Sequence, residues 1–224
     1  MITELCKRVL ADDAPAFIEL LQEHGAADYS HGTCSGHPIL HTAVVFNRLD
    51  IVKALLSAGI GGVDVNGLRD YTNSSALDVA IYLGRVEMID VLIGLVTPTH
   101  TFTPLHLAAI SGNPAAVRRL LTHPAHLRGD VNAVSKQQLT PLHCVANKTR
   151  VDAMQKHAQI YEQRVLEGIL QEQSFRLVWN PPQRVENGSD LRAVVDMLVA
   201  AGADITILGK GVNCMKGLSL TTTI

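Results

Sequence analysis

The sequence is short of net charge and of long apolar runs, and each shortage excludes a class of function. Its 224 residues carry 19 Lys and Arg against 21 Asp and Glu, which leaves a formal net charge of −2. A protein that binds nucleic acid without sequence preference needs many uncompensated cations, so we expect no nucleic-acid partner. No apolar stretch approaches the ~20 residues that cross a bilayer, so we expect no membrane association.

Cysteines are few and scattered. Cys6, Cys34, Cys144 and Cys214 lie far apart, and none forms a Cys-x-x-Cys pair of the kind found in zinc ribbons and redox motifs. The first eight residues carry charges where a secretory signal needs an unbroken apolar core. These features predict free thiols and a cytoplasmic location.

A short segment recurs along the chain. Residues Thr103–Gly112 read TPLHLAAISG, and Thr140–Ala146 read TPLHCVA. Looser copies occupy Pro38–Ala43 and Ser75–Ala80, where Asp78 takes the place of His. A second apolar segment soon follows each of the first three copies, whereas the partner of the last copy is displaced to residues 194–199. Such self-similarity indicates a repeat protein.

Each copy predicts a pair of helices. Thr103 and Thr140 can cap a helix whose first residue is proline, a position where the missing N–H costs nothing. Gly84 and Gly112 enter the left-handed conformation cheaply and should end the first helices, and Asn47 is the next most tolerant residue there. Apolar residues at helical spacing then indicate a second helix.

These segments resemble the ankyrin repeat, whose Thr-Pro-Leu-His-x-Ala-Ala-x-x-Gly signature matches Thr103–Gly112 and whose Gly-Ala-Asp link matches Gly202–Asp204. The resemblance implies an all-α fold, a solenoid of stacked helix-turn-helix units with short β-turn fingers. It also implies that His41, His106 and His143 bond to neighbouring backbone, and that the activity is protein binding.

We expect a single repeat domain over residues 1–224. Its parts are a capping repeat at 1–33, repeats at 34–69, 70–98 and 99–134, a repeat at 135–206 with an insertion at 147–190, and a tail or incomplete repeat at 207–224. The insertion has the spacing of a long amphipathic helix that ends near Trp179. That helix could pack on a neighbouring repeat or act as an arm that contacts a partner. Residues 123–129 are expected to be a loop.

No set of residues indicates catalysis, a metal site or a cofactor. Pro38 separates His37 from His41, and His123 and His126 have no nearby cysteine or carboxylate. Two functions remain. The first is a non-catalytic interaction module that acts as adaptor, scaffold or masking inhibitor. The second is a targeting fragment of a larger enzyme, with the chemistry on a missing domain or in the insertion.

The resemblance implies that a partner polypeptide, bound to a monomer, would lie along the concave face. The helix positions there are Val45, Phe46, Tyr82, Leu83, Ile110, Ser111, Asn147 and Lys148. The finger positions are Tyr71, His100, Phe102, Lys136, Gln137 and Leu139. Many of these side chains are large and apolar, which is typical of a binding stripe if they face solvent. Packing between repeats is the alternative, above all for Phe46 and Leu83.

Overall fold

The structure is a computed structural model that describes residues 2–24, 33–34, 37–57, 65–66, 74–95, 102–146, 163 and 188–207. The chain divides into two compact units. The first comprises residues 1–97 and 159–182, and the second comprises 98–158 and 183–224. Among the described residues, no helix has the length and apolar character needed to cross a membrane.

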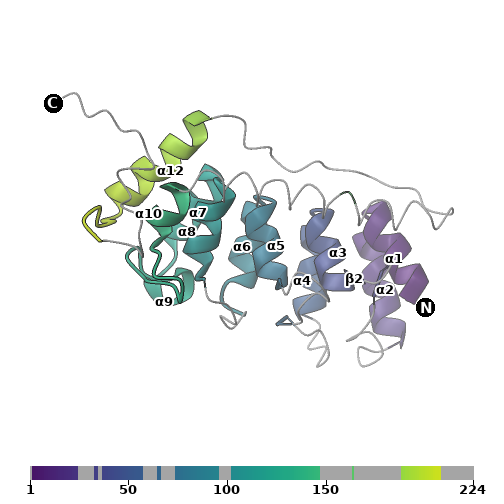
Figure 1. Ribbon diagram of the computed structural model, residues 1–224. Coiled ribbons are helices and arrows are strands. Elements are labelled where there is room, and N and C mark those ends of the chain that lie inside the picture. Colours follow the sequence, from purple (N-terminus) through teal and green to yellow (C-terminus); the bar gives the residue numbers. More distant parts are fainter. Residues whose placement is uncertain are drawn as a thin grey trace. The chain divides into compact units, whose positions relative to one another are not determined.

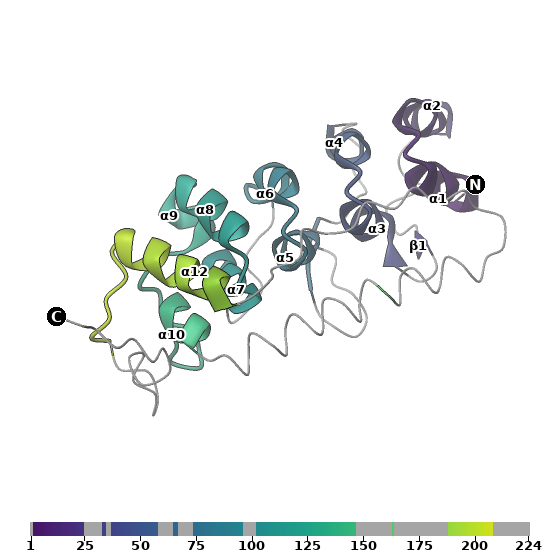
Figure 2. The ribbon, with the colours of Figure 1, turned by 90° about the horizontal axis from the view of Figure 1, so that it is seen from above.

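The first unit is a stack of helical hairpins (Figure 1). Its elements are α1 (Ile2–Ala11), α2 (Ala14–His24), β1 (Thr33–Cys34), β2 (His37–Pro38), α3 (Ile39–Val45), α4 (Leu49–Ser57), α5 (Ala76–Tyr82) and α6 (Val86–Leu92). In one row α1 contacts α3 and α3 contacts α5, and in a second row α2 contacts α4 and α4 contacts α6 (Figure 2). The predicted N-terminal repeat is therefore a helix pair that stacks like the others.

Helix ends lie where the sequence predicts them. The backbone is left-handed at Asn47 beyond α3, at Gly84 beyond α5 and at Gly112 after α7 (Pro104–Ser111), with φ of 59°, 65° and 66°. At the start of α5, the Ser75 Oγ accepts from the Asp78 N–H, and the Asp78 carboxylate accepts from the Ser75 N–H at 2.8 Å. This capping box gives Asp78 the local role that histidine has in other copies.

The core lies between the two rows of helices. Ile51, Val52 and Leu55 of α4 are buried, as are Met88, Ile89 and Leu92 of α6. Both sets follow the i, i+1, i+4 spacing of one helix face. The apolar stripe of each second helix therefore packs against its own repeat and its neighbours.

A buried arginine also links consecutive repeats. Arg48 has an exposed fraction of only 1%. Its guanidinium donates to the carbonyls of Val9 at 2.9 Å and Leu10 at 3.1 Å, at the end of α1, and pairs with Asp12 at 3.2 Å. Burial lowers the pKa of Arg48 and the Asp12 charge partly offsets this shift. Arg85 repeats the arrangement by donating to the Val45 carbonyl at 2.8 Å. Carbonyls in the last turn of a helix lack intrahelical donors, and the two arginines donate to carbonyls at the ends of α1 and α3.

The second unit contains α7 (Pro104–Ser111), α8 (Pro114–Thr122), α9 (Ala125–Arg128), α10 (Pro141–Ala146) and α12 (Gly188–Ala200). Helix α7 contacts α8 and α10, and α12 contacts both α8 and α10. The predicted starts at Pro104 and Pro141 are confirmed.

Two boundaries in this unit differ from expectation. Residues 125–128 form a helical turn instead of loop, because the Arg128 and Gly129 N–H groups donate to the carbonyls of Pro124 and Ala125. Helix α12 begins at Gly188, so its first residues fall within the insertion expected at 147–190. Of the long helix predicted to end near Trp179, only Gln163 is among the described residues, and it is helical. The tail beyond Ile207 lies outside them.

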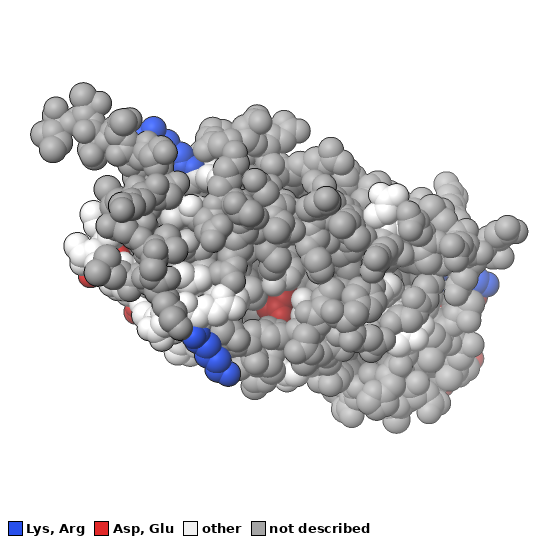
Figure 3. Space-filling model, viewed as in Figure 1, with Lys and Arg blue, Asp and Glu red and all other residues white. Residues whose placement is uncertain are grey.

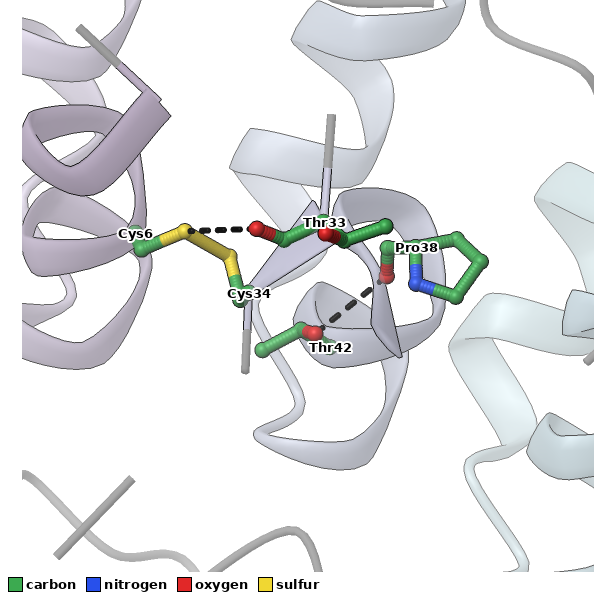
Figure 4. Close-up of a disulfide and its surroundings, with 5 residues drawn as sticks. All are labelled: Cys6, Thr33, Cys34, Pro38 and Thr42. Atoms are coloured by element: carbon green, nitrogen blue, oxygen red, sulfur yellow. Dashed lines mark hydrogen bonds between the residues drawn. A yellow bond between two sulfur atoms is a disulfide. The ribbon is translucent and has the colours of Figure 1, made fainter. Parts of the chain in front are cut away.

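The expectation of free thiols is wrong for one pair, because Cys6 and Cys34 form a disulfide (Figure 4). Their Cα atoms are 5.6 Å apart, within the usual range for such a bond. They are 28 residues apart in the sequence, so spacing gives no hint of the pair. Stacking of the first two repeats places α1 against β1. Cys144 is free and buried, and Cys214 lies outside the described residues. The thiol argument for a cytoplasmic location therefore does not hold for this pair.

Candidate functional site

The clearest candidate surface is a finger between α9 and α10. The Ser135 N–H donates to the Leu139 carbonyl at 2.9 Å, and the Gln138 N–H donates to the Ser135 carbonyl at 2.9 Å. Gln138 has a φ of 60°, the left-handed conformation that closes the turn. Lys136 and Gln137 are exposed at the tip. The backbone bonds therefore present these two polar side chains on an ordered turn.

His106 fixes this finger to the preceding helix. Its Nε2 lies 2.9 Å from the Leu139 carbonyl, which can only accept, so Nε2 carries the proton. Its Nδ1 accepts from the Thr103 N–H at 3.3 Å and lies 2.8 Å from the Thr103 Oγ1. Burial lowers the pKa of His106, while its bonds to the Leu139 and Ala133 carbonyls oppose that shift. A neutral imidazole thus ties α7 to the finger.

The base of the finger is joined to the turn that follows α12. The Asn132 side chain donates to the Gly202 carbonyl at 3.0 Å and accepts from the Asp204 N–H at 2.7 Å. The Asp204 carboxylate accepts from the Thr206 hydroxyl and N–H, and these two bonds lower the pKa of Asp204. The two turns therefore support each other side by side.

Apolar side chains flank the polar tip. Phe102 is partly exposed, and its ring centroid lies 5.6 Å from that of His106. Leu139 is also partly exposed, and Val134 has an exposed fraction of 52%. We call Phe102, Val134, Lys136, Gln137 and Leu139 the finger surface. All of these residues except Val134 were predicted from the sequence as positions that contact a partner. The sequence signal for Val134 would be an apolar residue just before a turn.

The predicted helix positions behave differently. Val45, Phe46, Leu83, Ile110 and Ser111 are all buried, so they are not part of an exposed stripe. For Phe46 and Leu83 the packing alternative is confirmed. The Phe46 ring faces the Arg48 guanidinium, whose central carbon is 6.0 Å from the ring centroid. The side chains at these helix positions are buried because each first helix is short and has a neighbouring helix on either side.

Tyr82 is the exception among the described helix positions, since it is partly exposed. Burial of its phenol and the nearby charge of Asp78 raise the pKa of Tyr82, so the phenol stays protonated. It lies in the first unit and is not grouped with the finger surface. Tyr71, His100, Asn147 and Lys148 lie outside the described residues.

Comparison with known proteins decides the family. Sequence models described as "Ankyrin repeats (3 copies)" and "Ankyrin repeats (many copies)" match residues 6–100 and 105–156. The chain belongs to the ankyrin repeat family. A crystal structure of the human ASB11 ankyrin repeat domain is similar, with a TM-score of 0.51 and 18% identity over 98% of this chain and 93% of that one. At this identity the likeness shows the fold alone. No curated protein matches the chain significantly.

Ankyrin repeats are in general protein–protein interaction modules, and the chemistry of this surface agrees with that class. Among the described residues, no group of three or more His, Cys, Asp or Glu side chains could hold a metal ion. On the face seen in Figure 3, the lysines and arginines of described residues appear as separate spots and not as a continuous basic area. The finger surface offers hydrogen bonds and apolar contact to a protein.

Proposed function

We propose that this ankyrin repeat protein is a non-catalytic interaction module that binds a partner polypeptide through the finger surface. An adaptor, a scaffold and a masking inhibitor would all use such binding. The partner would meet the amide of Gln137 and the ammonium of Lys136 at the centre, with Val134, Leu139 and Phe102 beside them.

The rigidity of the finger supports this proposal most directly. An exposed apolar side chain adds affinity when the partner covers it without first ordering the loop that carries it. Here three sets of bonds order the loop in advance: the turn bonds of Ser135, the His106 bond to Leu139, and the Asn132 bonds to the next turn. A loop that only faced solvent would need none of these three sets of bonds.

Site-specific photocrosslinking tests the proposal. A benzophenone amino acid replaces Gln137 at the finger tip in one version of the full chain, and exposed Arg118 of α8 in a matched version. Both proteins are irradiated in lysate from the native cells. We expect a discrete crosslinked band at position 137 and none of that size at position 118. The Val134→Asp substitution should abolish the band, because it places a charge in the apolar part of the contact.

Two results would contradict the proposal. Equal crosslinking at positions 137 and 118 would indicate non-specific contact, and no band at 137 alongside one at 118 would move the site to the second helices. Phe46→Ala is unsuitable as a surface probe, because its ring is fully buried and its removal would destabilise the first unit.

A further inference from the structure

We propose that the chain after α12 builds a second finger, defined here as residues 207–213, which covers the far side of α10. In this second finger the Asn213 carbonyl accepts a hydrogen bond from His143. The inference concerns the end of the stack and does not depend on partner binding. It is carried by the described residues around His143 and by the turn that leads into the tail.

In two repeats the signature histidine points toward the following repeat. His41 Nε2 lies 3.1 Å from the Ser74 carbonyl, and His106 Nε2 lies 2.9 Å from the Leu139 carbonyl. In both cases the acceptor directly precedes the residue that caps the next first helix. A buried histidine at this position therefore has the next segment of the stack in front of its Nε2.

His143 of α10 has the same local geometry as His106. Its Nδ1 accepts from the Thr140 N–H at 3.3 Å and lies 2.7 Å from the Thr140 Oγ1, and the corresponding distances from His106 to Thr103 are 3.3 Å and 2.8 Å. The Nε2 of His143 therefore points away from α7, toward the place of a following repeat. His143 nevertheless has an exposed fraction of only 1%, and it makes an interaction beyond these bonds. Part of the chain must cover that side of α10.

The described helices do not account for this cover. Of them, α7 and α12 pack on α10. Helix α7 precedes α10 in the stack, and α12 is the second helix of the same repeat. Neither position is that of a following repeat. The cover must therefore come from another part of the second unit, and the tail and the residues directly after α10 are the two candidates.

The turn after α12 favours the tail. The Asp204 carboxylate accepts from the N–H two residues further on at 2.8 Å, and the Asp130 carboxylate does the same at 2.8 Å. The Asn132 side chain joins the two turns, so the turn at Asp204 takes the place of the base of the next finger. Leu139 follows Asp130 by nine residues, and the residue at the same distance from Asp204 is Asn213. The tail therefore has the length of chain that the preceding finger uses to meet its histidine.

The tail sequence also resembles that of the preceding finger. Residues Val134–Lys136 read VSK, and residues Leu208–Lys210 read LGK at the same distance from their aspartates. Gly211 lies one residue from the place of Gln138, whose φ of 60° closes the turn, and glycine adopts that conformation without strain. The second finger would thus present an apolar residue and a lysine next to those of the finger surface.

Photocrosslinking within the full chain tests which segment covers α10. A diazirine amino acid replaces Val212, next to the proposed acceptor, in one version, and exposed Val199 of α12 in a matched version. After irradiation of the purified protein, we expect an intramolecular crosslink from position 212 to the peptide that contains α10, and none to that peptide from position 199. A crosslink from position 212 only to other segments, or one that joins two copies of the chain, would overturn the proposal.

Hydrogen exchange of the unmodified full chain is the second test. We expect amides of residues 208–213 to exchange at least about tenfold more slowly than in a random coil, because the second finger is held on α10. His143→Ala should remove this protection, whereas His126→Ala should keep it, since His126 is exposed on α9. Exchange of residues 208–213 at the random-coil rate in the wild type would refute the proposal, and this result needs no variant.

Discussion

At the scale of the residue, buried histidines connect one repeat to the next. His41 Nε2 lies 3.1 Å from the Ser74 carbonyl and His106 Nε2 lies 2.9 Å from the Leu139 carbonyl, in each case 33 residues further along the chain. The same ring caps its own helix through Nδ1 in the case of His106. One side chain therefore fixes both the start of a helix and the position of the next finger.

This arrangement predicts a loss of stability in mild acid. Protonation of His106 would place a hydrogen on Nδ1 against the Thr103 N–H, and burial already lowers the pKa of His106. The unfolded chain therefore takes up the proton first as the pH falls. We expect the free energy of unfolding to be constant above about pH 7 and to fall below about pH 6.5, by at most ~1.4 kcal/mol per pH unit for this one proton.

Urea unfolding at a series of pH values measures this slope. His106→Gln should be less stable throughout but should lose less stability between pH 7 and pH 5. His126→Gln is the matched control, because its side chain is exposed on α9. A slope that is the same in wild type and His106→Gln would show that another group titrates.

Residues that make sequence-local bonds could be predicted, whereas Arg48 could not. Its position just after a helix suggests an exposed, solvated cation. Only the neighbouring repeat supplies the carbonyls at the end of α1 and the Asp12 carboxylate that make burial of the guanidinium tolerable. The same holds for the disulfide, whose two cysteines have no pattern in common.

At the scale of the element, glycines decide how tightly a turn can pack on a helix. Gly129 has φ 89° and ψ 149°, a region open to glycine alone, and a Cβ placed there would overlap the Thr103 side chain that caps α7. Gly202 has a φ of 93°, but a Cβ placed there would meet nothing. A substitution at Gly202 therefore tests backbone strain alone, whereas one at Gly129 adds steric overlap.

We expect Gly129→Ala to lower the free energy of unfolding by about 3 kcal/mol and Gly202→Ala by only about 1 kcal/mol. The larger effect combines backbone strain with displacement of the Thr103 cap. Chemical denaturation with circular dichroism measures both values. Equal losses would show that the turn after α9 moves away from Thr103 at little cost.

At the scale of the whole molecule, stability in a repeat protein is expected to be local. Each hairpin buries its apolar stripe mainly against its neighbours, so damage in one place should be felt most nearby. Leu120 of α8 is fully buried, whereas Val199 of α12 has an exposed fraction of 45%. These two positions form a matched pair within the second unit.

Leu120→Ala should cost about 3 kcal/mol because it leaves a cavity between α8 and its neighbours. Hydrogen exchange should then become faster in α7, α8, α10 and α12, and change much less in α1 to α4. Val199→Ala should leave exchange close to wild type in both units. A uniform acceleration along the chain after Leu120→Ala would indicate that all repeats unfold as a single cooperative unit.

The sequence by itself determined the repeat, the helix starts at Thr103 and Thr140, and the helix ends at Asn47, Gly84 and Gly112. These features depend on bonds and backbone angles within a few residues, which local sequence encodes. Only the tertiary structure decided that Phe46 is core and that Cys6 meets Cys34. Burial and long-range pairing depend on which neighbouring repeat covers a side chain, and that is a property of the stack and not of any one segment.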